Sequence, residues 1–177
     1  MSSGRRPSAI SGVSASNEAA IMTIYPSIAS YSLARILAFL YESIPLKIMG
    51  VKLSYLLFVL PTAPLAVLMY AMQKLFGDRY TITNRSMQVW KALGTRKVTQ
   101  VLLTDITGIE VRELPGQKFY KAAELILLGG KSNDEIMRIS GIPYPHIFKQ
   151  TIIEARDARQ QVAKSLETIK ARPVLNA

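Results

Sequence analysis

One long uncharged segment constrains this chain more than any other feature. Residues 53–73, between Lys52 and Lys74, contain no charged side chain. A helix of this length rises about 1.5 Å per residue and is roughly 31 Å long, which matches a bilayer hydrocarbon core about 30 Å thick. A soluble domain within a chain of 177 residues has little reason to contain such a segment. We therefore expect a membrane-spanning helix here.

A weaker apolar segment precedes it at residues 28–49 and includes Arg35 and Glu42. A charge at the centre of a bilayer costs at least about 2.5 kcal/mol. In a helix over residues 27–46, however, Arg35 and Glu42 would lie toward opposite membrane surfaces, which long side chains can reach. We favour a second spanning helix, and an interfacial or re-entrant helix is the alternative.

Together the two apolar segments predict a transmembrane helical hairpin over residues 25–76. Residues 47–52 would form its turn, which contains Gly50. Lys and Arg are more frequent beside the outer ends of this hairpin than in its turn, so the positive-inside rule places both termini in the cytoplasm. Pro61 and Pro64 should bend the second helix for structural reasons. The expected location is the inner (cytoplasmic) membrane, with a multi-pass topology.

The rest of the chain divides into a tail and a sheet domain. Residues 1–24 are rich in Ser and Ala and lack the apolar core of a signal peptide, so we expect a flexible tail. Residues 77–155 contain short alternating runs rich in β-branched and aromatic residues, with turn signals about 8 to 12 residues apart. They predict an antiparallel sheet or small barrel, with strands over residues 79–83, 87–93, 95–103, 107–114, 118–128 and 135–140.

The end of the chain is expected to be helical, beginning near Pro145, a residue type that suits the first turn of a helix. Four apolar residues then recur at helical spacing and should pack on the sheet: Ile147, Phe148, Ile152 and Ala155. Residues 156–177 continue as a weaker amphipathic extension and tail that projects past the domain. The expected fold class is α+β.

Several short motifs resemble a known family. Residues 25–27 read Tyr-Pro-Ser before the apolar hairpin, residues 80–85 read Tyr-Thr-Ile-Thr-Asn-Arg, and residues 103–109 and 141–145 add further matches. The layout resembles the bacterial pleckstrin-homology-like (PH-like) membrane proteins of the YdbS type, over about residues 24–155. The resemblance implies two helices followed by a bent antiparallel half-barrel that a C-terminal helix closes. One departure is the segment 120–124, where the family often has glycines.

Residue types exclude most catalytic chemistry. The chain has no Cys and one His, so disulfides, thiolate catalysis, Cys-based metal sites and multi-His metal sites are excluded. His146 follows Pro145 and is expected to be a structural residue of a first helical turn. We expect no enzyme activity, no catalytic residue, no metal and no cofactor. No nucleic acid is expected either, because the aromatic residues do not cluster as a stacking platform.

Charge distribution leaves two functional hypotheses. From Lys74 onward there are 17 Lys or Arg and 10 Asp or Glu. This excess either only orients the anchor or also attracts anionic lipid headgroups. The possible headgroup contacts are Lys74, Arg79, Arg85 and Lys91.

The favoured hypothesis is a non-catalytic interaction or scaffold module, an accessory or assembly subunit of a larger membrane complex. Its partners would be membrane lipids and other membrane-protein subunits. The alternative is an anionic-lipid-sensing module, and an enzyme or transporter ranks third. Trp90, the only tryptophan, is expected either in the sheet core or at the membrane interface.

Overall fold

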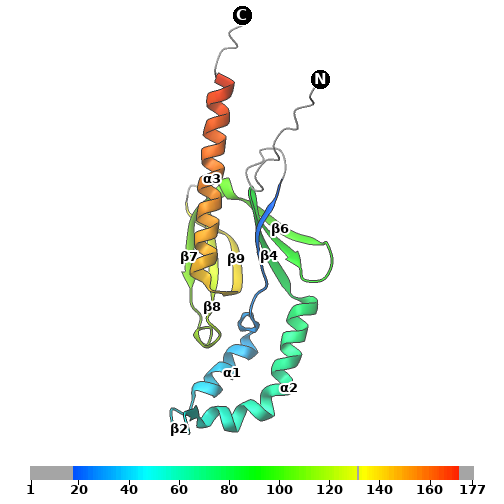
Figure 1. Cartoon of the computed structure of the whole chain (residues 1–177), viewed down its shortest axis with the longest axis vertical. Coiled ribbons are helices and arrows are strands. Elements are labelled where there is room, and N and C mark those ends of the chain that lie inside the picture. Colours follow the sequence, from blue (N-terminus) through cyan, green and yellow to red (C-terminus); the bar gives the residue numbers. More distant parts are fainter. Residues whose placement is uncertain (1–17, 131, 172–177) are drawn as a thin grey trace, which may run out of the picture.

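Two antiparallel sheets and one long helix make up the domain in the computed structural model, which describes residues 18–130 and 132–171 (Figure 1). The first sheet has the strand order β1-β4-β5-β6, and the second has the order β7-β8-β9. The strands are β1 (Ala20–Ile24), β4 (Asp78–Thr83), β5 (Ser86–Lys91), β6 (Lys97–Leu102), β7 (Ile106–Arg112), β8 (Ala122–Gly129) and β9 (Asp134–Pro143). The expected antiparallel sheets with a C-terminal helix are confirmed.

The two sheets and the C-terminal helix enclose one apolar core. Strands of the first sheet contribute alternate residues to it, because successive side chains of a strand point to opposite faces. Tyr80 and Ile82 of β4 and Met87 and Val89 of β5 are buried in this core. β8 lies between β7 and β9 and is buried over most of its length, in keeping with its nearly continuous apolar sequence.

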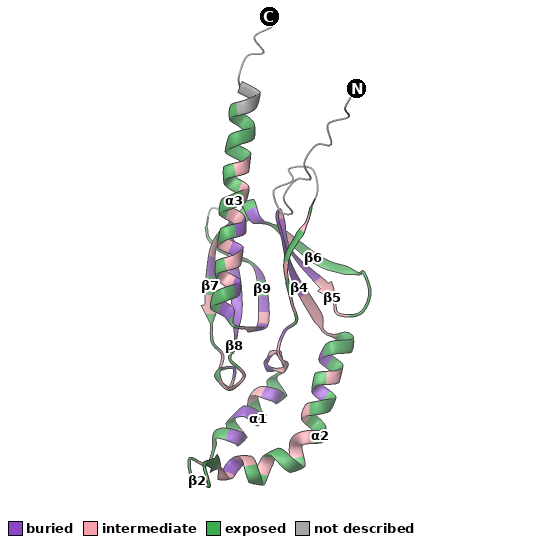
Figure 2. Ribbon diagram, viewed as in Figure 1, coloured by how far each residue is buried: buried purple, intermediate pink, exposed green. Residues whose placement is uncertain are grey.

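The helix α3 (Pro145–Ala171) closes the core and then continues past the sheets (Figure 1). Phe148, Ile152 and Ala155 are buried against the core, as their spacing predicts. From Asp157 to Glu167 its residues are exposed or half-buried. The helix begins at Pro145 as expected, and its distal half projects from the domain (Figure 2).

The helix α2 (Leu53–Phe76) has 24 residues and is the one helix in the described part of the chain that is long and apolar enough to cross a membrane. Only 6% of its most apolar 18-residue window is buried inside the structure, so α2 is not the core helix of a soluble domain. Most of its length is exposed or half-buried in Figure 2. Pro61 and Pro64 lie inside it, and Figure 1 shows the helix bent.

The first arm of the hairpin is shorter than predicted. A short 3-10 helix, η1 (Ile28–Ser30), precedes α1 (Ser32–Glu42), which has eleven residues. Eleven residues rise only about 16 Å, well under the roughly 20 residues that a spanning helix needs. The prediction of a spanning helix over residues 27–46, and with it a two-helix transmembrane hairpin, is therefore not confirmed. Hydropathy indicated an apolar segment but not where its helix begins and ends.

The first arm, η1 and α1, contacts α2 near both ends of α2. The Ser54 hydroxyl donates a hydrogen bond to the Tyr41 carbonyl at one end, and Ser30 Oγ lies 3.5 Å from Gln73 Oε1 at the other. Because α2 is longer than α1, a bend in α2 allows its first part to contact α1 and its last part to contact η1. The turn between the arms pairs β2 (Lys47–Ile48) with β3 (Val51–Lys52) through Met49 and Gly50, which both have positive φ.

The strand β1 corrects one sequence-based expectation. Residues 1–24 were expected to form a flexible tail, but Ala20–Ile24 form an edge strand that pairs antiparallel with β4, from Ala20 opposite Thr83 to Ile24 opposite Tyr80. Residues 1–17 lie outside the described residues. The short, partly polar β1 sequence gives little periodicity, and its partner strand lies about 60 residues further along the chain.

A second correction concerns the predicted strand 118–128. Its first residues instead form a 3-10 turn, η3 (Lys118–Tyr120), and Lys121 has a φ of 51°, so the strand begins only at Ala122. A left-handed residue interrupts the extended backbone that a strand needs. This is the segment in which the sequence departs from the family resemblance.

Candidate functional site

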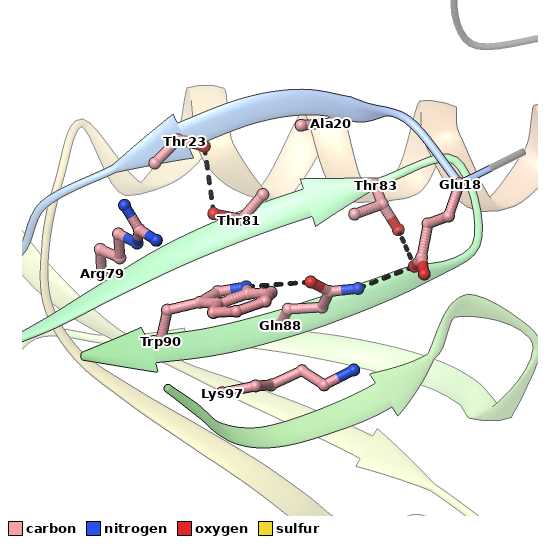
Figure 3. Close-up of a pocket in the computed structure, with 9 residues that line it drawn as sticks. All are labelled: Glu18, Ala20, Thr23, Arg79, Thr81, Thr83, Gln88, Trp90 and Lys97. Atoms are coloured by element: carbon pink, nitrogen blue, oxygen red, sulfur yellow. Dashed lines mark hydrogen bonds between the residues drawn. The ribbon is translucent and has the colours of Figure 1, made fainter. Parts of the chain in front are cut away.

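A polar groove lies on the face of the first sheet that points away from the core (Figure 3). Its volume is about 470 Å³. Nine residues from β1, β4, β5, β6 and the segment before β1 line it: Glu18, Ala20, Thr23, Arg79, Thr81, Thr83, Gln88, Trp90 and Lys97. Among the residues that line the groove, only Glu18 is acidic, whereas Arg79 and Lys97 are basic.

Strand register brings these polar side chains together. Thr81 lies opposite Thr23 of β1 and opposite Gln88 of β5, and Arg79 lies opposite Trp90. The two threonine hydroxyls are 3.1 Å apart. Because alternate residues of β4 and β5 fill the core, the residues between them necessarily share the opposite face. The polar residues of two core strands thus form a continuous surface.

The Glu18 carboxylate occupies one end of the groove. Its Oε1 atom lies 2.7 Å from the Thr83 hydroxyl, 2.8 Å from Gln88 Nε2 and 2.5 Å from the Ser86 hydroxyl. Hydrogen bonding by Ser86, followed by Thr83 and Gln88 and the charge of Lys97, holds the pKa of Glu18 below its ordinary value, although partial burial opposes this. These donors therefore favour an ionised carboxylate.

The other end of the groove is cationic and aromatic. The Arg79 guanidinium and Lys97 Nζ lie 5.7 Å and 5.9 Å from the centre of the Trp90 ring. Trp90 Nε1 donates to Gln88 Oε1 over 2.9 Å, and Arg79 Nη2 donates to the Gly94 carbonyl over 3.3 Å. Arg79 Nε is buried and has no hydrogen-bond partner among the described residues. This end has the charge and the donor capacity to bind an anion.

The four predicted headgroup contacts do not form one cluster. Arg79 lies in the groove, and Lys91 pairs with Asp78 over 2.7 Å. Lys74 Nζ lies 4.3 Å from the centre of the Tyr25 ring, near the end of α2. Arg85 follows β4, at the opposite end of that strand from Arg79. Their contact with lipid headgroups stays a prediction. Trp90 lies in the groove, on the side of the sheet away from the core.

A basic loop at residues 116–121 lies beside α1 and was not identified from the sequence as a candidate site. Its lysines, Lys118 and Lys121, line a second pocket of about 420 Å³ together with Glu113, Tyr144 and His146, among others. The loop is held against the hairpin, since the ring centres of Phe119 and Tyr41 are 5.6 Å apart. The segment was expected to be a strand, so nothing in the sequence indicated that these lysines lie next to an apolar helix.

Comparison with protein families decides the classification. A family model described as bacterial PH domain matches residues 22–162, which include the end of β1, the hairpin, strands β4 to β9 and the first part of α3. The chain belongs to the bacterial PH domain family. Comparisons with curated proteins and with solved structures give no match.

The family indicates a non-catalytic interaction or lipid-binding module. The described residues of this bacterial PH domain include no group of three or more His, Cys, Asp or Glu side chains that could hold a metal ion. Its groove presents hydrogen-bond donors and two basic side chains, which suit the binding role that the family indicates.

Proposed function

We propose that this bacterial PH domain is a membrane-attached interaction module. The α1–α2 hairpin lies in the inner membrane, the domain lies on its cytoplasmic side, and the domain binds proteins as an accessory or assembly subunit of a larger membrane complex. The observation that carries the membrane attachment is the exposure of α2, whose most apolar window is 6% buried.

Exposed apolar side chains cover both arms of the hairpin. On α1, Leu33, Ile36 and Phe39 are 44%, 61% and 53% exposed, and on α2 Leu60 is 81% exposed. Soluble monomers rarely expose contiguous apolar patches larger than a few hundred Å². Burial of one such side chain contributes about 1.5–3 kcal/mol, so together they favour insertion into lipid strongly. The core of the domain is complete without them.

Charges at the tip of the hairpin favour a crossing of the whole bilayer. Glu42, Lys47 and Lys52 lie where the two arms meet. If the hairpin ended at the bilayer centre, each of these charges would cost at least about 2.5 kcal/mol. We propose that the tip reaches the far surface and that the bilayer thins locally around the short α1, because a short apolar stretch is accommodated in this way. The loop around Phe119, whose ring contacts Tyr41 and Tyr55 near the tip, would then enter the bilayer beside α1. Both termini then lie in the cytoplasm.

The interaction role is supported by what the domain presents to the cytoplasm. The groove combines a tryptophan with two cations, and the distal half of α3 projects past the sheets. Neither feature is needed to close the core.

Purification of the full chain from its native membrane in mild detergent, with mass spectrometry of the co-purifying proteins, tests this role. We expect a stoichiometric membrane-protein partner. A chain that consistently purifies alone would contradict the proposal.

Lipid sensing is the second candidate function. Lys118 and Lys121 lie on a loop that packs against the apolar hairpin, so insertion of the hairpin would bring this loop to the lipid, where the long lysine side chains can extend to headgroups. A lysine near an anionic surface contributes about 1 kcal/mol of attraction.

The full chain in nanodiscs tests this candidate. Amide exchange at residues 116–121 should slow when anionic lipid replaces zwitterionic lipid, and Lys118→Gln with Lys121→Gln should abolish the difference. Exchange that is indifferent to lipid charge would exclude the loop as a sensor.

A further inference from the structure

The groove of the first sheet contains a preformed carboxylate site. Thr83, Ser86 and Gln88 all lie within hydrogen-bond distance of one Glu18 oxygen. These three side chains are themselves buried, with 4%, 0% and 5% exposure, although they lie on the face away from the core. Buried polar side chains are costly unless their hydrogen bonds are made. The site is therefore occupied in cis by the chain's own carboxylate.

Glu18 fills only one end of the groove. At the other end Arg79 and Lys97 flank Trp90, and Arg79 Nε is buried without a hydrogen-bond partner among the described residues. A buried donor without a partner carries a desolvation penalty that an arriving acceptor would remove. A second anionic group at this end would also meet the positive charges of Arg79 and Lys97, of which Lys97 already interacts with the charge of Glu18 and donates a hydrogen bond to Gln100.

The separation of the two ends suggests the form of the ligand. Arg79 and Thr83 are four residues apart on β4, which corresponds to about 13 Å of extended chain. In an extended peptide, side chains two and four residues apart lie on one face, at about 7 Å and 13 Å. Acidic residues at alternate positions of a peptide therefore match the groove, whereas a single phosphate would fill only one end.

We infer that the groove binds an acidic segment of a partner protein, in which one carboxylate replaces that of Glu18 and another binds between Arg79 and Lys97. Glu18 then competes with the partner for the Thr83–Gln88 end of the groove. This inference rests on the interaction role proposed above and names the chemistry of the partner.

Trp90 provides a direct reporter, because it is the only tryptophan and lies in the groove. The probe is the peptide acetyl-Glu-Ala-Glu-Ala-Glu-amide, titrated into the full chain in detergent while tryptophan fluorescence is recorded. We expect a saturable change. Removal of the competing carboxylate by Glu18→Ala should tighten binding by about tenfold, and Arg79→Gln or Lys97→Gln should weaken it by about tenfold.

Three controls separate this site from general attraction to a basic protein. Lys164→Gln removes an exposed lysine of α3, far along the helix from the domain, and should leave the affinity unchanged. The peptide with Gln in place of Glu should not bind. Circular dichroism shows whether Glu18→Ala folds. If it does not, Glu18→Gln takes its place, because this variant removes the charge and keeps a polar side chain. The comparison of Arg79→Gln with the unsubstituted chain does not depend on either Glu18 variant.

Three results would overturn the inference: equal binding of the Gln peptide, equal affinity in the folded Glu18 variant and the unsubstituted chain, or inorganic phosphate that binds as tightly as the acidic peptide. If the titration fails in one of these ways but the chain still co-purifies with a membrane-protein partner, the interaction role stands and only the groove as its binding site is excluded.

Discussion

The Tyr120 hydroxyl donates a 2.9 Å hydrogen bond to the main-chain carbonyl of Ala34, which lies 86 residues earlier in the sequence. This bond joins η3 of the domain to α1 of the hairpin. Phe119 supports it by ring contacts with Tyr41 and Tyr55. The domain is therefore held to its anchor by tertiary packing as well as by the chain, and a change in one can affect the position of the other.

Tyr120→Phe tests this attachment. The substitution keeps the ring and removes the hydroxyl that bonds to α1, so we expect a loss of about 1 kcal/mol in the free energy of unfolding. Amide exchange at η3 should become faster. Tyr144→Phe is the matched control, because Tyr144 is 61% exposed and should change stability little. Equal effects of the two substitutions would show that the bond to Ala34 does not stabilise the attachment.

Two glycines with similar backbone angles test the packing of β9 against η1. Gly141 and Gly130 have φ of +70° and +74°, so alanine costs about 1–2 kcal/mol in backbone strain at either position. At Gly141 a Cβ would also lie 2.9 Å from the Ser30 nitrogen and 3.0 Å from the Ser27 oxygen, whereas at Gly130 nothing lies within 4 Å.

Thermal unfolding in detergent should therefore show a larger loss for Gly141→Ala than for Gly130→Ala, by on the order of 1–3 kcal/mol. The expected difference comes from the close contacts of the new Cβ at position 141, because the backbone strain is similar at the two positions. Losses of equal size would mean that η1 does not pack closely on β9.

Neighbouring residues of α3 test which face of the helix closes the core. Phe148 is fully buried and Ile147 is 59% exposed. Phe148→Ala should cost about 3–5 kcal/mol, the usual range for removal of a buried aromatic side chain. Ile147→Ala should cost well under 1 kcal/mol. Urea unfolding of the full chain distinguishes them, and similar midpoints for the two variants would contradict the described packing.

Ionisation of Tyr80 is expected to reduce the stability of the domain at alkaline pH. Burial, aided by the charge of Asp78, raises the pKa of Tyr80 to about 12, compared with about 10 for an exposed tyrosine. The folded state therefore holds this proton more tightly than the unfolded state. The corresponding stability is fully present below pH 10 and is lost as the pH rises from about 10 to 12.

Tyr80→Phe should reduce this alkaline loss by on the order of 1 kcal/mol, as unfolding measured at pH 9 and pH 11 would show. Comparing the loss of stability between pH 9 and pH 11 in the two chains cancels the contribution of lysine ionisation, which both chains share. An identical pH dependence in the two chains would contradict the assignment.

Much of the architecture could be predicted because local signals mark it. Turn signals bound β4 to β7 closely, and Pro145 marks the start of α3, whereas β8 begins later than its predicted strand. The length of α1 and the strand β1 could not be predicted in the same way. Ser27 caps the start of η1 by accepting a hydrogen bond from the Ala29 amide, and the extended backbone of Tyr31 separates η1 from α1 inside one apolar segment. β1 depends on a partner strand far along the chain.

The groove was predictable only in part. Alternation along β4 and β5 indicates that Thr81 and Gln88 share a polar face. That Glu18 would lie beside Gln88 depends on the register of β1, and no local pattern in the sequence specifies this register. The four basic residues singled out from sequence were chosen for their closeness to α2 along the chain, and only Arg79 lies in the groove.

Cysteine labelling at the tip of the hairpin tests the membrane attachment most directly. The chain has no Cys, so Met49→Cys, at a residue that is 99% exposed in the turn, introduces a single thiol. Leu93→Cys, between β5 and β6, is the control on the domain, at a residue that is 60% exposed. In intact spheroplasts a membrane-impermeant maleimide should label Cys at position 49 and should label Cys at position 93 only after lysis. Labelling of both positions only after lysis, together with release of the chain from membranes at high salt, would contradict the account.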